Sequence, residues 1–250
     1  MFSLKGKTAL ITGASRGLGQ AIAFALAQAG AYVICSSSRE GGCSETLAKI
    51  TENGFQGCEI AANLSDMDSV KALAEKALAK NNGVDILVNN GGTIARYPAV
   101  DFPYEEWQNV LKVNLDSAFV LSQEIGRHMI AKGEGKIINT ASMLSYSGGI
   151  TVPAYTASKH AIAGVTKALA NEWAQFNIQV NAIAPGYFAT DNTAAIRADE
   201  KRNADITARI PAARWGQPED LGGAAVFLAS AASNYINGHV LNVDGGWMAR

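Results

Sequence analysis

The stretch Lys7–Gly19, KTALITGASRGLG, decides the fold. Its first part, Lys7–Thr12, is a short apolar run typical of a buried strand, and Gly17–Ala29 continues with apolar residues at helical spacing. Three glycines in the order G-x-x-x-G-x-G lie between strand and helix, where they let the backbone approach a pyrophosphate that the helix N-terminus attracts. We therefore expect a dinucleotide-binding loop with contacts from Gly13, Ser15, Arg16, Gly17, Leu18 and Gly19.

The same alternation of apolar runs and helical patterns continues along the chain. Further strands are expected at Ala31–Ser36, Phe55–Ala61, Asp85–Val88, Lys136–Thr140, Ile178–Ala184 and Val240–Val243. Further helices are expected at Cys43–Asn53, Asp66–Asn81, Lys112–Lys132, Tyr155–Phe176 and Pro218–Ala229. Continuous apolar strands with short joins indicate parallel strands covered on both faces. The sequence therefore predicts one α/β domain over residues 1–250, a three-layer, doubly wound parallel sheet of Rossmann type.

The least regular stretch, residues 187–214, follows the sixth expected strand. In a doubly wound fold it would lie at the carboxyl ends of the strands, where ligands bind. We expect a substrate lid within it, and the alternative is an ordinary surface excursion.

Composition excludes several classes of protein. The 250 residues are 48% hydrophobic and 17% charged, which supports a full core. With 21 Lys and Arg against 22 Asp and Glu, the net charge of -1 argues against nucleic-acid and membrane partners. Three cysteines without framework spacing and an N-terminus lacking an apolar signal region predict a cytoplasmic protein. The three histidines have no metal-ligand spacing, so no metal is expected.

The residues after the second strand bear on the choice of nicotinamide cofactor. NAD enzymes usually place a carboxylate there for the ribose 2′-hydroxyl. This chain has Ser37, Ser38 and Arg39 before Glu40, and Arg16 adds a second cation nearby. Hydroxyls and guanidinium groups suit a 2′-phosphate, so NADP(H) is favoured and NAD(H) stays open.

Four polar residues suggest hydride-linked chemistry. Tyr155 and Lys159 share one helix face, and Ser142 follows the strand whose carboxyl end meets the same crevice. Reduction of a ketone needs a proton donor at the developing alkoxide, and a tyrosine near a lysine cation can serve. Ser142 can hold the substrate oxygen beside Tyr155, and Asn114 lies in the preceding long helix.

These motifs resemble the short-chain dehydrogenase/reductase family over essentially the whole chain. The resemblance rests on Thr12–Gly19, Asn89–Gly92, Asn114, Ser142, Tyr155 with Lys159, and Pro185–Gly186. It implies a catalytic tetrad of Asn114, Ser142, Tyr155 and Lys159, in which the tyrosine is the acid/base, the lysine lowers its pKa and binds the nicotinamide ribose, and the asparagine holds a water. It also implies cofactor contacts from Asn63, Leu64, Asn90, Gly91, Gly92, Tyr155, Lys159, Pro185, Gly186, Phe188 and Thr190. Two residues depart from the family pattern: Gly91 replaces an alanine and Asn63 an aspartate.

Motifs in the second half, including Ser142–Ser145, Asn181–Tyr187 and Val243–Trp247, resemble the sugar-acid branch of that family. The resemblance implies a reversible oxidoreductase acting on a keto-deoxy sugar acid of uronate breakdown, most narrowly 2-dehydro-3-deoxy-D-gluconate and its 5-keto form, and a homotetramer built on the two long helices. Candidate substrate contacts are the cations Arg96, Arg197 and Arg214 and the walls Met143, Tyr187 and Trp215. A 3-oxoacyl-carrier-protein reductase and a cofactor-sensing protein without turnover are the alternatives.

Overall fold

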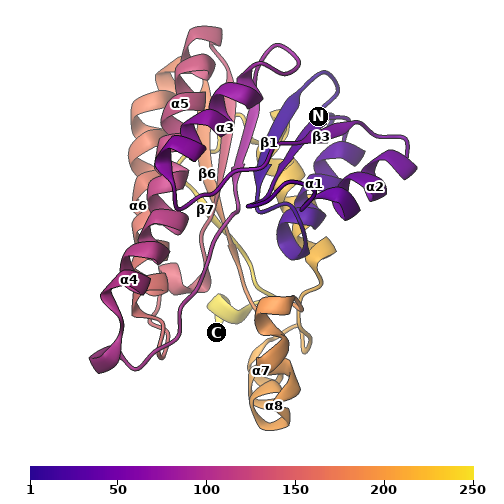
Figure 1. The fold of residues 1–250 in the computed structure, drawn as a ribbon. Helices are drawn as coiled ribbons and strands as arrows, with labels where there is room; N and C mark the ends of the chain where they lie inside the picture. Colours follow the sequence, from indigo (N-terminus) through magenta and orange to yellow (C-terminus); the bar gives the residue numbers. More distant parts are fainter.

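Seven parallel strands form one sheet in the order β3-β2-β1-β4-β5-β6-β7 (Figure 1) in the computed structural model, which describes all residues from Met1 to Arg250. The strands are β1 (Thr8–Thr12), β2 (Tyr32–Ser36), β3 (Gly57–Glu59), β4 (Ile86–Asn89), β5 (Gly135–Thr140), β6 (Ile178–Pro185) and β7 (Val240–Val243). The strand order reverses between β1 and β4, which places a ligand crevice at their carboxyl ends. The predicted doubly wound sheet is confirmed.

Helices cover both faces of this sheet. One face carries α1 (Gly17–Gln28), α2 (Ser44–Glu52) and α9 (Gly222–Ala229), and the other carries α3 (Met67–Leu78), α5 (Ser117–Lys132) and α6 (Pro153–Trp173). Strand residues alternate between the two layers: Ala9 and Ile11 pack with α1 and α9, while Leu10 packs with α3 and α5. This double burial explains why the strands read as continuous apolar runs. None of the helices combines the length and apolarity that crossing a bilayer requires.

Several elements differ from the sequence prediction. Helix α4 (Tyr104–Leu111) was not predicted, and a π-helical turn over Lys112–Asp116 separates it from α5. The irregular stretch after β6 contains two short helices, α7 (Ala194–Ala198) and α8 (Glu200–Arg209), which project beyond the carboxyl edge of the sheet (Figure 1). Helix α8 has no buried residue, so no apolar stripe marked it in the sequence.

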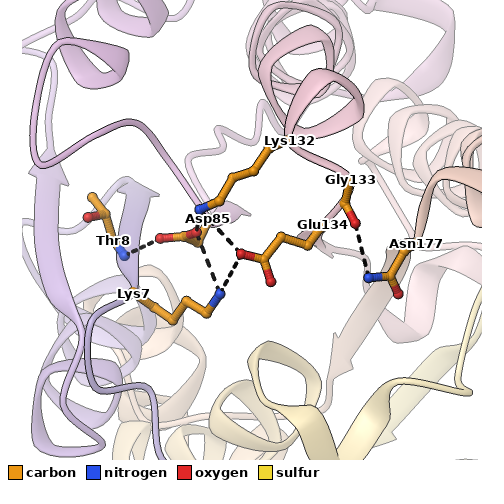
Figure 2. Close-up of polar contacts among 7 residues, drawn as sticks. All are labelled: Lys7, Thr8, Asp85, Lys132, Gly133, Glu134 and Asn177. Atoms are coloured by element: carbon orange, nitrogen blue, oxygen red, sulfur yellow. Dashed lines mark hydrogen bonds and ion pairs between the residues drawn. The ribbon is translucent and has the colours of Figure 1, made fainter.

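The opposite, amino edge of the sheet holds a network of charges (Figure 2). Asp85, only 7% exposed, pairs with Lys132 and with Lys7 at 3.7 Å, and accepts the N–H of Thr8 at 2.8 Å. Glu134 pairs with the same two lysines, at 2.8 Å from Lys7 and 3.3 Å from Lys132. Each charge therefore faces two opposite charges, and the network joins the starts of β1, β4 and β5.

Candidate active site

The glycine loop between β1 and α1 has no room for larger residues. Gly13 has φ +64°, and a Cβ there would lie 2.8 Å from the Cα of Gly91. A Cβ on Gly19 would lie 2.0 Å from the Gly13 carbonyl oxygen. Helix α1 begins after Arg16 without a side-chain cap, so its first N–H groups face the crevice unpaired. This cradle fits the phosphates of a dinucleotide.

The end of β4 is tied directly to that loop. The Asn90 side chain donates to the carbonyl oxygens of Thr12 at 3.0 Å and Gly13 at 3.2 Å. In return, the hydroxyl of Thr12 accepts the backbone N–H groups of Asn90 and Gly91, at 3.1 and 2.9 Å. These four bonds fix the switch point of the sheet, where the two halves of a dinucleotide would meet.

Gly91, the departure from the family alanine, has a local explanation. A Cβ at this position would lie 2.4 Å from Cδ1 of Leu64. The leucine side chain thus fills the space that the alanine methyl group would take. Asn63, the second departure, turns its amide oxygen back onto Ser65, accepting the backbone N–H at 3.1 Å and the hydroxyl at 2.9 Å.

In the loop after β2, which begins with Ser37, Ser38 and Arg39, some side chains are free to contact a ligand and others are already bonded. Ser38 and Arg39 are exposed, and their side chains make neither hydrogen bonds nor ion pairs within the chain. The Ser37 hydroxyl, in contrast, donates to the carbonyl oxygen of Arg39 at 2.9 Å. The second expected cation, Arg16, pairs with Asp191 at 3.4 Å across the crevice.

Tyr155 and Lys159 lie together near the start of α6, at the carboxyl edge of β5. The lysine Nζ lies 5.5 Å from the centroid of the tyrosine ring and donates to the Thr140 carbonyl oxygen. Lys159 is only 4% exposed and forms no ion pair. This burial lowers the pKa of Lys159 to about 8, because the charged form loses hydration.

The electrostatics of Tyr155 differ from the expectation. Burial raises the pKa of the phenol above 10.0, while a hydrogen bond from Ser142 and the charge of Arg96 lower it. The Lys159 ammonium stands over the ring face and bonds to the Thr140 carbonyl oxygen, and no hydrogen bond joins it to the phenol oxygen. The structure therefore holds Tyr155 protonated, ready to donate.

Ser142 and Asn114 are each fixed by backbone contacts. Ser142 begins the 3-10 turn Met143–Ser145 and accepts the N–H of Leu144 at 3.1 Å. Asn114 sits in the π-helical turn, where its oxygen accepts the Thr93 N–H at 2.8 Å. Its amide donates to the Thr93 carbonyl at 2.9 Å and to the Ser158 hydroxyl at 3.1 Å. Both side chains are therefore held at this edge beside α6.

The segment after β6 leaves the carboxyl edge of the sheet next to the glycine loop. A Cβ on Gly186 would lie 2.6 Å from the Cα of Asp244, so the chain leaves β6 tightly against the end of β7. Phe188 is buried in the core against Gly216, so its side chain turns away from the crevice. Thr190 approaches the glycine loop, since its Cγ2 lies 3.5 Å from the place of a Cβ on Gly17. Thr190, in the segment 187–214, therefore lies next to Gly17 in the glycine loop.

The candidate substrate residues separate into two groups. Arg96 acts electrostatically on Tyr155, and Met143 belongs to the turn that Ser142 begins. A different set of residues lines a hollow of about 770 Å³ within and beside the segment 187–214, comprising Ala189, Arg197, Asn203, Thr207, Arg214, Trp215, Gln217 and Asp220. Of these two groups, the structure therefore places only Arg96 and Met143 near Tyr155.

Side chains in the second group bond mainly to each other. Arg214 forms a two-pronged pair with Asp220, at 2.6 and 3.1 Å. The indole N–H of Trp215 donates to Asn203 at 2.8 Å, which holds α8 against the body of the protein. Arg197 donates to the carbonyl oxygen of Thr190 at 3.1 Å. These contacts tie residues 187–214 together, and the buried Nε–H of Arg197 is left without a partner.

An aromatic cluster joins the lid to the C-terminus. The Tyr187 ring lies 5.3 Å from the ring of Trp215 and 4.8 Å from that of Trp247. The guanidinium of Arg209, in α8, stacks 4.0 Å from the Trp247 ring. Sequence reasoning assigned no role to Trp247 or Arg209, because residues this far apart in the chain carry no local signal of contact.

Comparisons with known proteins agree with this geometry. The family described as "Enoyl-(Acyl carrier protein) reductase" matches residues 13–248. A 2-dehydro-3-deoxy-D-gluconate 5-dehydrogenase from Bacillus subtilis (strain 168) is 59% identical over 249 residues, covering 100% of this chain and 97% of the relative.

Two solved structures align over nearly the full length of both chains. The first, an Agrobacterium tumefaciens protein provisionally named a 2-deoxy-D-gluconate 3-dehydrogenase, contains NADP; it is 51% identical, with a TM-score of 0.94 and coverage of 100% and 99%. The second, a gluconate 5-dehydrogenase from Burkholderia cenocepacia J2315 in complex with NADP and tartrate, is 39% identical, with a TM-score of 0.95 and coverage of 100% and 98%.

Proposed function

Because the chain belongs to the short-chain dehydrogenase/reductase family, we propose that it is an NAD(P)(H)-dependent oxidoreductase that interconverts a hydroxyl and a ketone on a sugar acid. We propose 2-dehydro-3-deoxy-D-gluconate and its 5-keto form, 2,5-diketo-3-deoxygluconate, as the reacting pair. The observation that carries the proposal is the half-buried Tyr155 side chain. The neighbouring Ser142 hydroxyl lowers the pKa of this phenol, and Lys159 Nζ stands 5.5 Å from the ring centroid, at the edge where the phosphate cradle opens.

Tyr155 supplies the proton chemistry in this proposal. When bound, the nicotinamide donates a hydride to the ketone carbon or accepts one from the alcohol carbon. During reduction, the Tyr155 O–H bond breaks and its proton goes to the carbonyl oxygen, which becomes the hydroxyl of the product. Burial keeps the phenol protonated, which suits this direction. The Ser142 hydroxyl holds the substrate oxygen in reach of the phenol.

Lys159 and Asn114 support the tyrosine. A cation over the ring favours the phenolate that remains after proton transfer, and no carboxylate pairs with Lys159 to cancel its charge. Asn114 is 4% exposed and anchors the turn before α5 to Thr93, one residue past the end of Asn89–Gly92. Following the family resemblance, we assign this segment the water through which the proton is returned.

Arg96 is the best-placed cation for the substrate carboxylate. It is exposed, forms no ion pair within the chain, and its charge acts on Tyr155. A guanidinium can bind a carboxylate with two parallel hydrogen bonds, which orients the acid end of the substrate. We propose that residues 187–214 act as the lid over this pocket, with Tyr187 forming one of its walls.

A substrate panel tests the reaction class and the substrate together. Absorbance of the reduced cofactor is followed with keto sugar acids, including 2,5-diketo-3-deoxygluconate, and with 3-oxoacyl thioesters. We expect turnover of sugar acids. Faster reduction of the thioesters would contradict the proposal in favour of a 3-oxoacyl-carrier-protein reductase, which the sugar-acid name of the 59%-identical relative does not favour. No turnover with any compound would favour a cofactor-sensing protein.

The same proposal includes a homotetramer built on the long helices α5 and α6. Phe119, in α5, is 42% exposed, and Gly164, in α6, is exposed with open space around its Cβ position. Exposed apolar groups on an outer helical layer are typical of association surfaces. Light scattering coupled to size exclusion tests this, and a monomeric mass would contradict it. We place the protein in the cytoplasm, since its three cysteines are all free.

A further inference from the structure

A carboxylate reaches the loop after β2 from the neighbouring strand. Glu59 is the last residue of β3 and lies in register with Cys35 of β2. Its Oε1 accepts the backbone N–H of Cys43 at 3.0 Å and the hydroxyl of Ser37 at 3.3 Å. Sequence reasoning looked for an acidic residue only at the end of β2. The structure brings one to the same loop from twenty-two residues further along the chain.

The proton of Ser37 is committed within the loop. A serine hydroxyl donates one hydrogen, and here its acceptors are the Arg39 carbonyl at 2.9 Å and Glu59 at 3.3 Å. Gly42 makes room for this hydroxyl, because a Cβ at residue 42 would lie 2.2 Å from the Ser37 oxygen. A phosphate is an acceptor and needs donors, so it would have to compete with both of these groups for the single Ser37 proton. Ser38 and Arg39 remain as the free side chains of this loop.

We propose that Glu59 is a specificity-determining residue, which weakens binding of the cofactor 2′-phosphate and so lets the enzyme use both NADP(H) and NAD(H). A phosphate oxygen bonded to Ser37 at about 2.7 Å would lie within about 6 Å of the Glu59 carboxylate, where like charges repel. NAD(H) meets no such repulsion, because its 2′-hydroxyl can donate to the Ser37 oxygen. This inference rests on the proposed use of nicotinamide dinucleotides.

The test is a change of cofactor preference in Glu59→Gln. Glutamine keeps an oxygen for the Cys43 N–H but removes the charge, and its amide group can donate to Ser37, so the Arg39 carbonyl is then the one remaining acceptor in the loop that competes for the serine proton. Calorimetric titration should show about five- to tenfold tighter NADPH binding and less than twofold change for NADH. The same difference is expected between adenosine 2′,5′-bisphosphate and 5′-AMP, which differ only in the 2′-phosphate.

Glu40→Gln is the matched control, because it removes an exposed carboxylate from the same loop that makes no side-chain hydrogen bond. Its NADPH-to-NADH affinity ratio should stay within twofold of the parent. Adding Ser37→Ala to Glu59→Gln should remove the part of the gain that comes from the serine hydroxyl and leave the part that comes from removing the Glu59 charge. If Glu59→Gln does not fold, Glu59→Ala must show the same direction of change.

The outcomes separate the two proposals. An unchanged affinity ratio in a folded Glu59 variant, or equal tightening of both cofactors, overturns the role of Glu59 while the parent still binds its cofactors. Failure of the parent protein to bind either nucleotide overturns the proposed function, and the inference with it.

Discussion

The two edges of the sheet treat buried charge in opposite ways. At the amino edge, Asp85 meets both Lys7 and Lys132, and Glu134 completes the network (Figure 2). At the carboxyl edge, Lys159 is equally buried but has only a carbonyl oxygen as partner. The first arrangement compensates each charge and joins three strands. The second arrangement leaves the Lys159 cation without an opposite charge, which lowers stability. Buried groups in such perturbed environments are typical of functional sites.

Tyr155→Phe gives the largest expected effect and tests the chemistry at the carboxyl edge. The substitution removes only the hydroxyl that donates the proton, so kcat should fall by about 1000-fold. Binding of NADPH, measured by its fluorescence, should change less than threefold. Turnover near that of the parent would remove the tyrosine from the role of acid.

Lys159→Met and Lys136→Met compare two lysines whose pKa burial lowers to about 8, one at each edge. An unfolded lysine titrates near 10.5, so the native state binds fewer protons between about pH 8 and 10.5. Parent stability therefore rises with pH through this range, and the cost of the buried charge is fully present below it.

At pH 7, Lys159→Met should be more stable than the parent by about 2–3 kcal/mol, and urea unfolding should show this gap closing towards pH 10.5. Its kcat should nevertheless fall sharply. Lys136→Met should show a smaller trend in stability, because Asn234 and solvent share the charge, with kcat unchanged. Equal losses of activity in both variants would contradict the contrast between the edges.

Asp85→Asn tests the network at the amino edge. Asparagine can still accept the Thr8 N–H, but two lysines lose their shared carboxylate. We expect a loss of about 2 kcal/mol in the free energy of unfolding, discounted because the lysines are partly exposed. Glu134→Gln, at a half-exposed carboxylate, should cost less than about 1 kcal/mol. The kcat of both folded variants should match the parent, and a marked fall in Asp85→Asn would link the two edges.

Gly91→Ala gives the smallest expected effect. Its new methyl group meets the end of the Leu64 side chain, which can turn aside, so stability should fall by less than about 1 kcal/mol. Binding of NADPH should weaken two- to threefold. Gly223→Ala, on an exposed helix position with open space, should be neutral or slightly stabilising. If Gly91→Ala binds NADPH as tightly as the parent, contact with Leu64 does not explain why residue 91 is a glycine.

The sequence was sufficient where local chemistry sets the structure. The glycine loop, the strand runs and the Tyr155–Lys159 spacing are local patterns, and each lies where it was expected. Helix α8 escaped detection because none of its residues is buried and Ile206 is its one large apolar residue, too little for an apolar stripe. Contacts such as Glu59 with Ser37, or Tyr187 with Trp247, depend on strand order and lid packing, which no short stretch of sequence encodes.

All seven strands point the same way, and this has a consequence for engineering. Three segments, around residues 90–98, 143–151 and 187–214, follow β4, β5 and β6. They therefore all emerge at the carboxyl edge of the sheet. The paired lysines and carboxylates sit at the opposite, amino ends of β1, β4 and β5. Random libraries confined to the three segments can therefore explore new substrates while the scaffold retains its anchoring, which is the separation that directed evolution needs.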